Sequence, residues 1–300
     1  MIKVPCHLCG ADDYDVVFPS NDQESMLAPH HLSARMIDAN KEYRHNWVRC
    51  KQCRLVYANP APEEDVLARL YTESDQGAYT YEVDNITRTY RKYLDRYGAH
   101  VTRRGRAVDV GAGAGFFLKA LLDFGFEDVI GYEPSAKACA SASPDVAPML
   151  RNRSFSPDDL GPGSVDLVTC FQTLEHVYHP EKTIRSFADV LSPGGVVYAV
   201  AHNFGSWGVR LLGERHPIVN AGHLTLFDMS TLRQIFENLG FDVIDVFKVT
   251  NRYSVRYWTE LLPLGETIKK PLAGFLKTVG AAAIPVSLSM GNMGIFARKG

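Results

Sequence analysis

Three glycines at alternating positions give the sequence its first chemical signal. The short apolar segment Arg106–Val110 carries Asp109 near its end, and Gly111, Gly113 and Gly115 follow it. A buried strand, a glycine-rich turn and a helix form the first half of a nucleotide-binding unit. Glycine permits the tight turn and lets a ligand approach the backbone. The unpaired N–H groups at the start of the helix would face that ligand.

The spacing of the glycines separates this loop from a dinucleotide-binding loop, which needs G-x-G-x-x-G. Here Phe116 stands where the last of those glycines would be, and the pattern is D-x-G-x-G-x-G. The next predicted strand, Asp128–Glu133, ends in an acid that could accept hydrogen bonds from both hydroxyls of a ribose. The alternatives are a structural glycine loop in another α/β protein and a helix-capping role for Glu133.

Four cysteines form two C-x-x-C pairs in the first sixty residues, Cys6 with Cys9 and Cys50 with Cys53. Four thiolates at this spacing suit a closed tetrahedral Zn²⁺ site. No export signal is visible, so we expect thiols that bind metal rather than disulfides. The sequence therefore predicts a zinc-binding module over residues 1–60, in which the metal stabilises the fold. His7, His30, His31 and His45 could compete as ligands, but beside a complete set of four cysteines we expect such histidines to be surface residues.

The composition bounds the class of protein. With 300 residues, the chain fits one main α/β domain and a small appended module. Its formal net charge of −2 argues against a protein that grips nucleic acid by bulk charge. No run of eighteen apolar residues appears, so we expect no membrane span. Together with the lack of an export signal, this predicts a cytoplasmic protein.

Polar residues follow the predicted central strand, Val165–Cys170. Gln172, Glu175 and His176 lie directly after it, where ligands of parallel α/β sheets bind. The segment 180–191 has the apolar spacing of an amphipathic helix. A turn with two glycines then leads into another apolar strand.

The order of these elements is similar to that of a known family. A glycine loop, a strand-end acid, VDLVTCFQTLEHV, LSPGG and a strand resemble the class I S-adenosylmethionine (SAM)-dependent methyltransferases over residues 104–250. The segment His223–Phe241 and the cysteine module fit the same resemblance. Together they resemble the zinc-module methyltransferases of sugar, polysaccharide and natural-product pathways. The resemblance implies an α/β fold, a Rossmann-like class I methyltransferase sheet with helices on both faces, preceded by a small zinc-ribbon-like module.

The resemblance also implies donor-binding roles. Asp109 and the glycine loop would hold the methionine portion of SAM, and Glu133 would hold its ribose. Gln172 would lie near the methionine end. The adenine-contacting position falls between Ser154 and Asp159, where Asp158, another acid or a backbone N–H could serve.

Two histidines are candidates for acid–base chemistry. Some relatives bind a divalent metal through E-x-x-E-H at the strand end, but Gln172 replaces the first acid here. His176 could act as a base or as a substrate contact. Some zinc-module C-methyltransferases resemble the stretch around His223 but carry Glu-His, with the histidine as a proposed base, where this sequence has Gly222-His223. His223 is our candidate general base, since imidazole titrates near neutrality; a structural role is the alternative for both histidines.

Two flanking segments could cover the site. Residues 203–222 form a long insertion, which we expect to be an ordered lid within the SAM-binding domain. Residues 61–103 read as a helical linker and lid, with Tyr79 and Tyr81 in a loop ahead of the main domain. Tyr81 is the third catalytic candidate. The later tyrosines of this segment are expected to pack a helix.

Residues 251–300 form a C-terminal extension. Cationic and apolar side chains alternate through residues 252–277, which makes this segment a candidate for peripheral membrane contact. Packing on the protein's own core is the alternative. Residues 292–299 should form a last strand, antiparallel at the middle or edge of the sheet.

The sequence as a whole predicts a SAM-dependent methyltransferase acting on a small-molecule, sugar or lipid-linked acceptor. Transfer to oxygen, carbon or nitrogen stays open, as does the oligomeric state. One alternative is an RNA methyltransferase that binds its substrate through the zinc module. A second is a non-catalytic SAM-binding interaction protein. The glycine spacing argues against an NAD-dependent enzyme.

Overall fold

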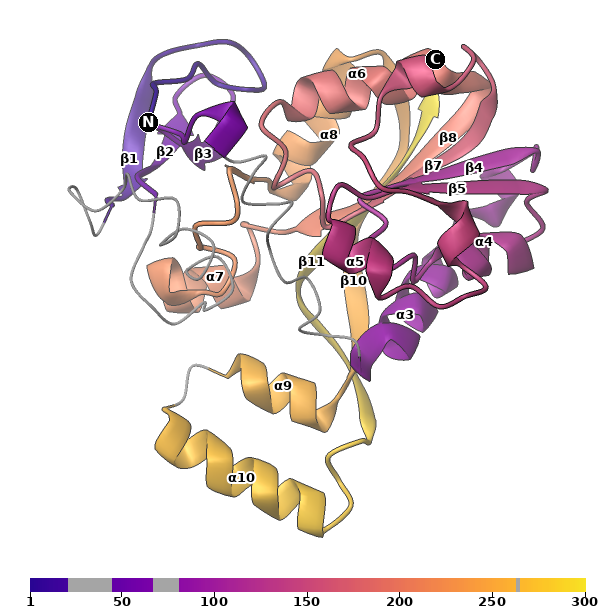
Figure 1. The fold of residues 1–300 in the computed structure, drawn as a ribbon. Coiled ribbons are helices and arrows are strands. Elements are labelled where there is room, and N and C mark those ends of the chain that lie inside the picture. Colours follow the sequence, from indigo (N-terminus) through magenta and orange to yellow (C-terminus); the bar gives the residue numbers. More distant parts are fainter. Residues whose placement is uncertain (21–44, 67–80, 263–264) are drawn as a thin grey trace.

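A computed structural model describes residues 1–20, 45–66, 81–262 and 265–300 of the chain. A seven-stranded sheet runs through its centre (Figure 1), and the strands of this sheet are β4 (Arg106–Val110), β5 (Asp128–Tyr132), β6 (Leu150–Arg151), β7 (Val165–Phe171), β8 (Leu191–His202), β10 (Phe241–Ser254) and β11 (Pro285–Lys299). Their order is β10-β11-β8-β7-β4-β5-β6. Strands β4 to β8 are parallel to one another, whereas β11 is antiparallel to both β8 and β10.

Helices cover both faces of this sheet, and the helices of the described residues are α3 (Val83–Tyr97), α4 (Leu118–Asp123), α5 (Ala136–Ala140), α6 (Pro180–Val190), α7 (Trp207–Leu212), α8 (Met229–Asn238), α9 (Val255–Leu261) and α10 (Glu266–Thr278). In Figure 1, α6 and α8 lie on one side of the sheet and α3 and α4 on the other. Among these helices, none combines the length and apolar character that crossing a bilayer requires.

Strand β8 shows why the sheet is buried on both faces. Successive side chains of a strand point to opposite faces. Tyr198 and Val200 belong to the apolar cluster that includes α3 and α4, whereas Val197, Ala199 and Ala201 belong to the cluster that includes α6 and α8. A continuous apolar run is what a parallel strand covered on both sides requires. The predicted α/β sheet with helices on both faces is confirmed.

The aromatic stripe of α3 packs as expected. Tyr93 stacks on Phe247 of β10 with ring centroids 4.7 Å apart, and Tyr97 stacks on Phe296 of β11 at 4.6 Å. The last strand lies in the interior of the sheet, between β8 and β10. Before Asn292, β11 pairs with β10 alone, so the two strands leave the sheet as an arm that ends in α9 and α10 (Figure 1).

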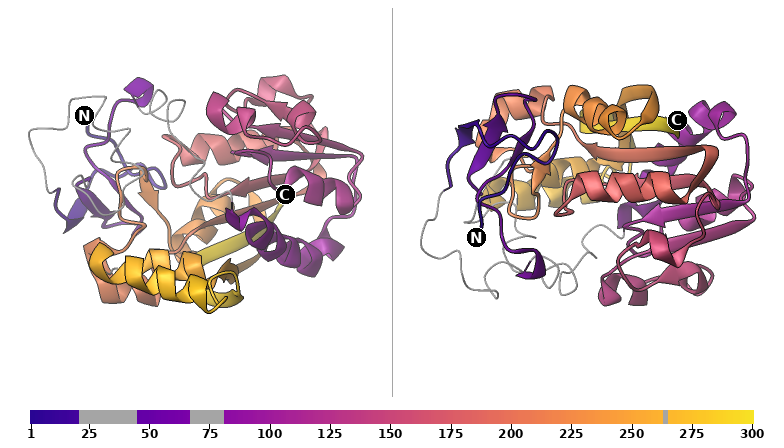
Figure 2. Two further views of the ribbon diagram at one scale, coloured as in Figure 1. Left: turned by 60° about the horizontal axis from the view of Figure 1, so that its bottom comes forward. Right: turned by 90° about the horizontal axis from the view of Figure 1, so that it is seen from above.

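The cysteine module contains a second sheet with the order β1-β2-β3-β9, formed by β1 (Tyr14–Phe18), β2 (Trp47–Cys50), β3 (Val56–Ala58) and β9 (Thr225–Leu226). Strand β9 comes from the main domain, directly after the insertion. The module also shares an apolar cluster with the face of the large sheet that α6 and α8 cover. Both views of Figure 2 place it at one end of the molecule, with β4 and β5 toward the other. The module is therefore completed by the main domain.

The prediction for His45 is wrong. Its side chain is completely buried, and its Nε2 atom lies 2.9 Å from the carbonyl oxygen of Ala221 in the insertion. Its ring also packs edge-on against Trp47 of β2. A histidine beside the cysteines thus connects the module to the insertion, a contact across 176 residues that local sequence does not reveal.

Candidate functional site

The glycine loop turns sharply after β4. Gly111 has a φ of 77°, and its N–H donates to the Tyr132 carbonyl oxygen at the end of β5, 2.9 Å away. A Cβ atom at Gly111 would lie 2.2 Å from Oγ1 of Thr173, so this position is sterically closed. At Gly113, with a φ of 56°, no atom lies within 4 Å of the Cβ position. The loop therefore leaves open space beside Gly113.

Glu133 follows β5 and contacts this open part of the loop. Its Oε2 atom accepts a hydrogen bond from the Gly113 N–H (2.9 Å), and Oε1 accepts one from Ser135 (2.8 Å). Burial raises the pKa of the Glu133 carboxyl, and the two N–H donors partly offset that shift. The hydrogen bond thus holds Glu133 directly beside the glycine loop.

Asp109 lies buried at the end of β4. Thr169 of β7 donates to its Oδ1 atom over 2.6 Å. Its Oδ2 atom has no hydrogen-bond partner in the part of the chain that the structure describes. Burial raises the pKa of this carboxyl to about 7. A buried carboxylate oxygen without a donor is unusual and suits a ligand that brings a cationic or N–H group.

Gln172 is the first residue beyond β7. It has a φ of 50°, in the left-handed region that non-glycine residues rarely occupy. Its N–H donates to the carbonyl oxygen of Val200, 2.6 Å away on β8. Such strain collects at functional sites. All the predicted donor residues lie at the carboxyl edge of β4, β5 and β7: Asp109, Gly111, Gly113, Gly115, Glu133 and Gln172.

Three histidines meet at the same edge. The His223 ring lies 4.5 Å from the His176 ring and 5.0 Å from the His202 ring, measured between centroids. Nδ1 of His176 lies 2.7 Å from the Gly222 carbonyl oxygen, and Nδ1 of His223 lies 2.7 Å from that of Ile218. Because a carbonyl only accepts, both Nδ1 atoms carry the proton and both Nε2 atoms offer a lone pair.

Glu175 brings a carboxylate to these histidines. Its Oε1 atom accepts a hydrogen bond from the backbone N–H of His202 (3.2 Å) and lies 3.8 Å from Nε2 of the His202 ring. Its Oε2 atom is buried without a hydrogen-bond partner among the described residues. One carboxylate oxygen of Glu175 and one ring nitrogen each of His202 and His223 lie within 4.8 Å of one another. The cluster therefore combines proton acceptors with one acid.

Burial sets the charge of this cluster. Desolvation lowers the pKa of His176 and lowers that of His223 further, and it lowers the pKa of His202 to about 4. Desolvation also raises the pKa of Glu175. At neutral pH the three imidazoles are therefore uncharged, as a group that accepts a proton must be.

Tyr81 lies in a different environment. Its hydroxyl donates to the Glu260 carboxylate of α9, and the Arg256 guanidinium lies 4.4 Å from its ring centroid. Burial and the Glu260 carboxylate raise the pKa of the Tyr81 hydroxyl. These contacts place Tyr81 against α9, and its catalytic role stays a prediction. Tyr79 lies outside the described residues.

The four predicted metal ligands converge. The Sγ atoms of Cys6 and Cys53 are 3.4 Å apart, and those of Cys9 and Cys50 are 3.5 Å apart. A tetrahedral site with Zn–S bonds of about 2.3 Å separates its sulfurs by about 3.8 Å. All four Sγ atoms lie within 4.8 Å of one another, so shifts of about 1 Å or less would let them surround one ion.

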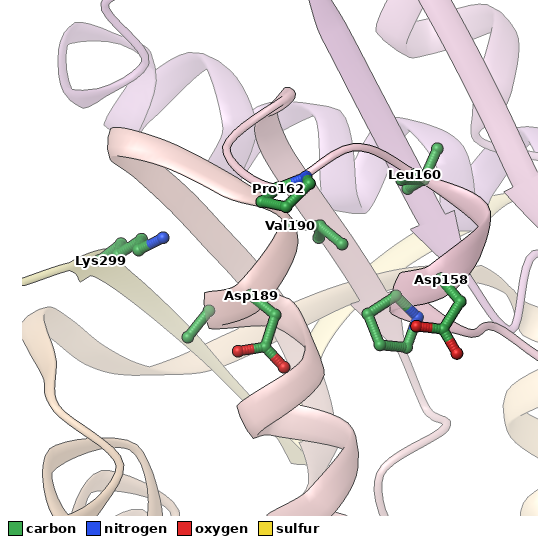
Figure 3. Close-up of a pocket in the computed structure, with 8 residues that line it drawn as sticks. Asp158, Leu160, Pro162, Asp189, Val190 and Lys299 are labelled. Carbon is green, nitrogen blue, oxygen red and sulfur yellow. The ribbon is translucent and has the colours of Figure 1, made fainter.

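A hollow of about 720 Å³ lies elsewhere, between the end of α6 and the loop before β7 (Figure 3). Asp158, Asp189 and Lys299 are among its lining residues. Lys299 donates to the carbonyl oxygen of Leu191, where β8 begins, 2.8 Å away. The hollow is thus at the amino edge of the sheet, opposite the glycine loop. Asp158 lines it, which does not favour this acid as an adenine contact.

Comparison with known proteins shows the family. A family model described as a methyltransferase domain matches residues 82–246, more than half of the chain, and the chain belongs to this family. A SAM-dependent methyltransferase from Archaeoglobus fulgidus superposes with a TM-score of 0.51 at 16% identity, covering 75% of this chain and all of that one. This likeness shows the fold. The predictions of a class I methyltransferase fold and of a SAM-dependent methyltransferase are confirmed.

Two curated relatives have the same name. A ubiquinone biosynthesis O-methyltransferase of Shewanella halifaxensis is 24% identical over 196 residues, 58% of this chain and 83% of the relative. One of Xanthomonas campestris pv. campestris is 36% identical over 111 residues, 35% of this chain and 46% of the relative. The chain thus spans less than half the length of the second relative.

Sequence reasoning missed His202 and its partner. Nδ1 of His202 lies 2.9 Å from Oδ1 of Asn292, and the Asn292 amide donates to Asn251. His202 ends β8, immediately beyond the strand that the sequence predicted. The rule that parallel sheets bind ligands at their carboxyl ends was the signal that could have found it. The contact with Asn292 depends on the pairing of β8 with β11.

Substituting two loop glycines should separate folding from donor binding. Gly111→Ala places a methyl group against Thr173 and should lower stability by about 1–3 kcal/mol. Gly113→Ala also places a non-glycine residue in the left-handed region, which costs about 1 kcal/mol of stability, but its methyl group enters open space. We expect Gly113→Ala to stay folded and to bind SAM at least tenfold more weakly, measured by calorimetry beside thermal melting. Unchanged SAM affinity in Gly113→Ala would place the donor elsewhere.

The partly buried, neutral imidazole of His202 should make stability depend on pH. Its pKa falls from 6.5 to about 4 on folding, so the unfolded chain binds the proton more readily. The contribution to stability is present above pH 6.5 and is lost as the pH falls toward 4. His202→Asn should therefore show a smaller fall in melting temperature over this interval than the wild type. His100→Asn is the control. Parallel curves for wild type and His202→Asn would contradict a lowered pKa of His202 in the folded protein.

Proposed function

We propose that the chain transfers a methyl group from SAM to a hydroxyl of a small-molecule acceptor, with His223 as the proton acceptor. The observation that carries this proposal is the cluster of three uncharged imidazoles and Glu175 at the edge that also carries the glycine loop. The shared name of the curated relatives, ubiquinone biosynthesis O-methyltransferase, supports a small-molecule oxygen acceptor.

The donor side of the proposal rests on the open loop. The unpartnered Oδ2 atom of Asp109 would receive the cationic part of the methionine portion. Glu133, fixed by two backbone N–H groups, would accept from the ribose hydroxyls. Gln172 would contact the methionine end. When bound, SAM supplies an already activated methyl group, so the protein has to align the acceptor and remove a proton.

The acceptor side rests on the tautomer of His223. The Ile218 carbonyl oxygen holds the proton on Nδ1, which leaves Nε2 to take the proton that the acceptor hydroxyl loses as its oxygen binds the methyl group. The imidazolium that forms would be buried, and the nearby Glu175 carboxylate would offset its charge. His176 would contact the acceptor or relay the proton.

The proposal leaves the class of hydroxyl-bearing acceptor open. Sugar and lipid-linked acceptors also present hydroxyl groups and fit the same chemistry. An RNA methyltransferase would bind RNA at low salt, which the net charge of −2 disfavours. A non-catalytic SAM-binding protein would form no S-adenosylhomocysteine with any acceptor. Product formation from an extract of candidate acceptors therefore distinguishes these alternatives.

Removing the imidazole of His223 should slow catalysis and spare donor binding. Loss of a positioned base costs about 10²–10⁴-fold in turnover. We expect His223→Ala to show this loss with SAM affinity within about threefold of wild type, and added imidazole to restore part of the rate. His100→Ala is the matched control, since it lies away from the cluster. A wild-type rate in His223→Ala would refute the assignment.

We also propose that the four cysteines bind one structural Zn²⁺. The convergence of their Sγ atoms and the softness of thiolate ligands support this. The ion would fix the ends of β2 and β3, and β3 pairs with β9 directly after His223. The metal would therefore hold the position of the candidate base from a distance.

Loss of the metal should thus affect turnover as well as stability. We expect Cys9→Ser to lower the zinc content from one ion per chain, to lower the melting temperature and to reduce turnover. SAM affinity should change little, because the glycine loop lies on other strands. Cys139→Ser is the control, with metal content determined by mass spectrometry. Full zinc content in Cys9→Ser would overturn the ligand set.

A further inference from the structure

Helix α10 carries an apolar stripe that faces solvent. Ile268, Leu272, Phe275, Leu276 and Val279 follow one another at helical spacing and lie on one side of the helix. Leu272 and Leu276 are half-buried. Ile268, Phe275 and Val279, in contrast, expose 55%, 63% and 55% of their surface. A helix in a globular protein normally buries such a stripe, so its exposure indicates a binding surface.

Positive charge predominates in the segment that contains this stripe. Between residues 255 and 284 the sequence carries four cationic and two anionic side chains, whereas the whole chain is net negative. Lys270 and Lys277 lie on the opposite, polar side of α10, and both are exposed. An apolar face combined with a lysine-bearing polar face is typical of helices that lie in the surface of an anionic membrane.

The hairpin of α9 and α10 is held firmly by the main domain. The buried Glu82 carboxylate accepts hydrogen bonds from the N–H and hydroxyl of Ser254, where β10 ends and α9 begins. Trp258 of α9 donates to the Val286 carbonyl oxygen of β11, 3.0 Å away. The hairpin stands at the end of the β10–β11 arm, away from α6 and α8 (Figure 1). It therefore presents its stripe in a fixed direction.

We propose that the α9–α10 hairpin docks on an anionic lipid surface, with Ile268, Phe275 and Val279 entering the headgroup region. Each of these side chains would leave water on binding, and the lysines would be attracted by the negative surface potential. Ile284, at the base of the hairpin, is a further exposed apolar side chain, with 52% of its surface exposed. This proposal does not depend on methyl transfer.

A second copy of the chain fits this surface less well. A helix of thirteen residues is only about 20 Å long, which is a short contact for a stable interface between two copies. The excess of cationic groups also disfavours pairing between identical hairpins. An anionic lipid surface, in contrast, complements both features.

Vesicle flotation of the full-length protein tests the proposal. We expect the wild type to float with vesicles of phosphatidylcholine mixed with phosphatidylglycerol, and to float less as salt rises. Phe275→Asp should abolish flotation. The matched control is Leu211→Asp, which changes a side chain that is 74% exposed on α7 and should float like the wild type. Replacing Lys270 and Lys277 by alanine should weaken binding about fivefold per lysine.

Three results would overturn the proposal. The first is no flotation of the wild type. The second is equal flotation with phosphatidylcholine alone, which would remove the role of the lysines. The third is a wild-type protein that is a dimer in light scattering and does not bind vesicles, and that Phe275→Asp converts to a monomer. This result would assign the stripe to self-association. Light scattering and thermal melting of each variant show whether its fold is retained.

Discussion

The backbone carbonyl of Glu175 holds together the parts on which the candidate site depends. It accepts hydrogen bonds from the N–H groups of Leu224 (2.8 Å) and Thr225 (3.2 Å). The loop after the central strand β7 is thereby joined to the residues that follow His223. These same residues pair with β3 of the cysteine module. One carbonyl oxygen thus connects the sheet edge, the insertion and the module, and the positions of His176 and His223 follow from this connection.

Desolvation governs the electrostatics of the whole carboxyl edge. It raises the pKa of Asp109, Glu133 and Glu175 and lowers that of the clustered histidines. Both shifts favour uncharged forms, so the edge is poised to take up charge from its ligands. A cationic donor would favour ionised acids, and a proton released by an acceptor would need one of the imidazoles. The same burial that costs stability in the free protein makes the site responsive to what binds there.

The sequence predicted what depends on local pattern. Strand β4, the glycine loop and the four cysteines were found because glycine conformation, buried runs and ligand spacing are short-range properties. The predicted last strand, residues 292–299, falls short of β11, because the outer half of β11 pairs only with β10. His45 and His202 were missed because their partners, Ala221 and Asn292, lie 176 and 90 residues away. Such contacts depend on how the sheets and the insertion meet.

The surroundings of His223 show how a carboxylate from a residue distant in sequence can take the place of one from the preceding residue. Related C-methyltransferases carry an acid directly before this histidine, and Gly222 stands there in this chain. The Ile218 carbonyl oxygen orients the ring instead, and Glu175 brings a carboxylate from the loop after β7. A glycine at position 222 also leaves its carbonyl oxygen to orient His176. The loop after β7 thus supplies both Glu175, which would stabilise the charged form of His223, and Gln172, which we propose contacts the methionine end of the donor.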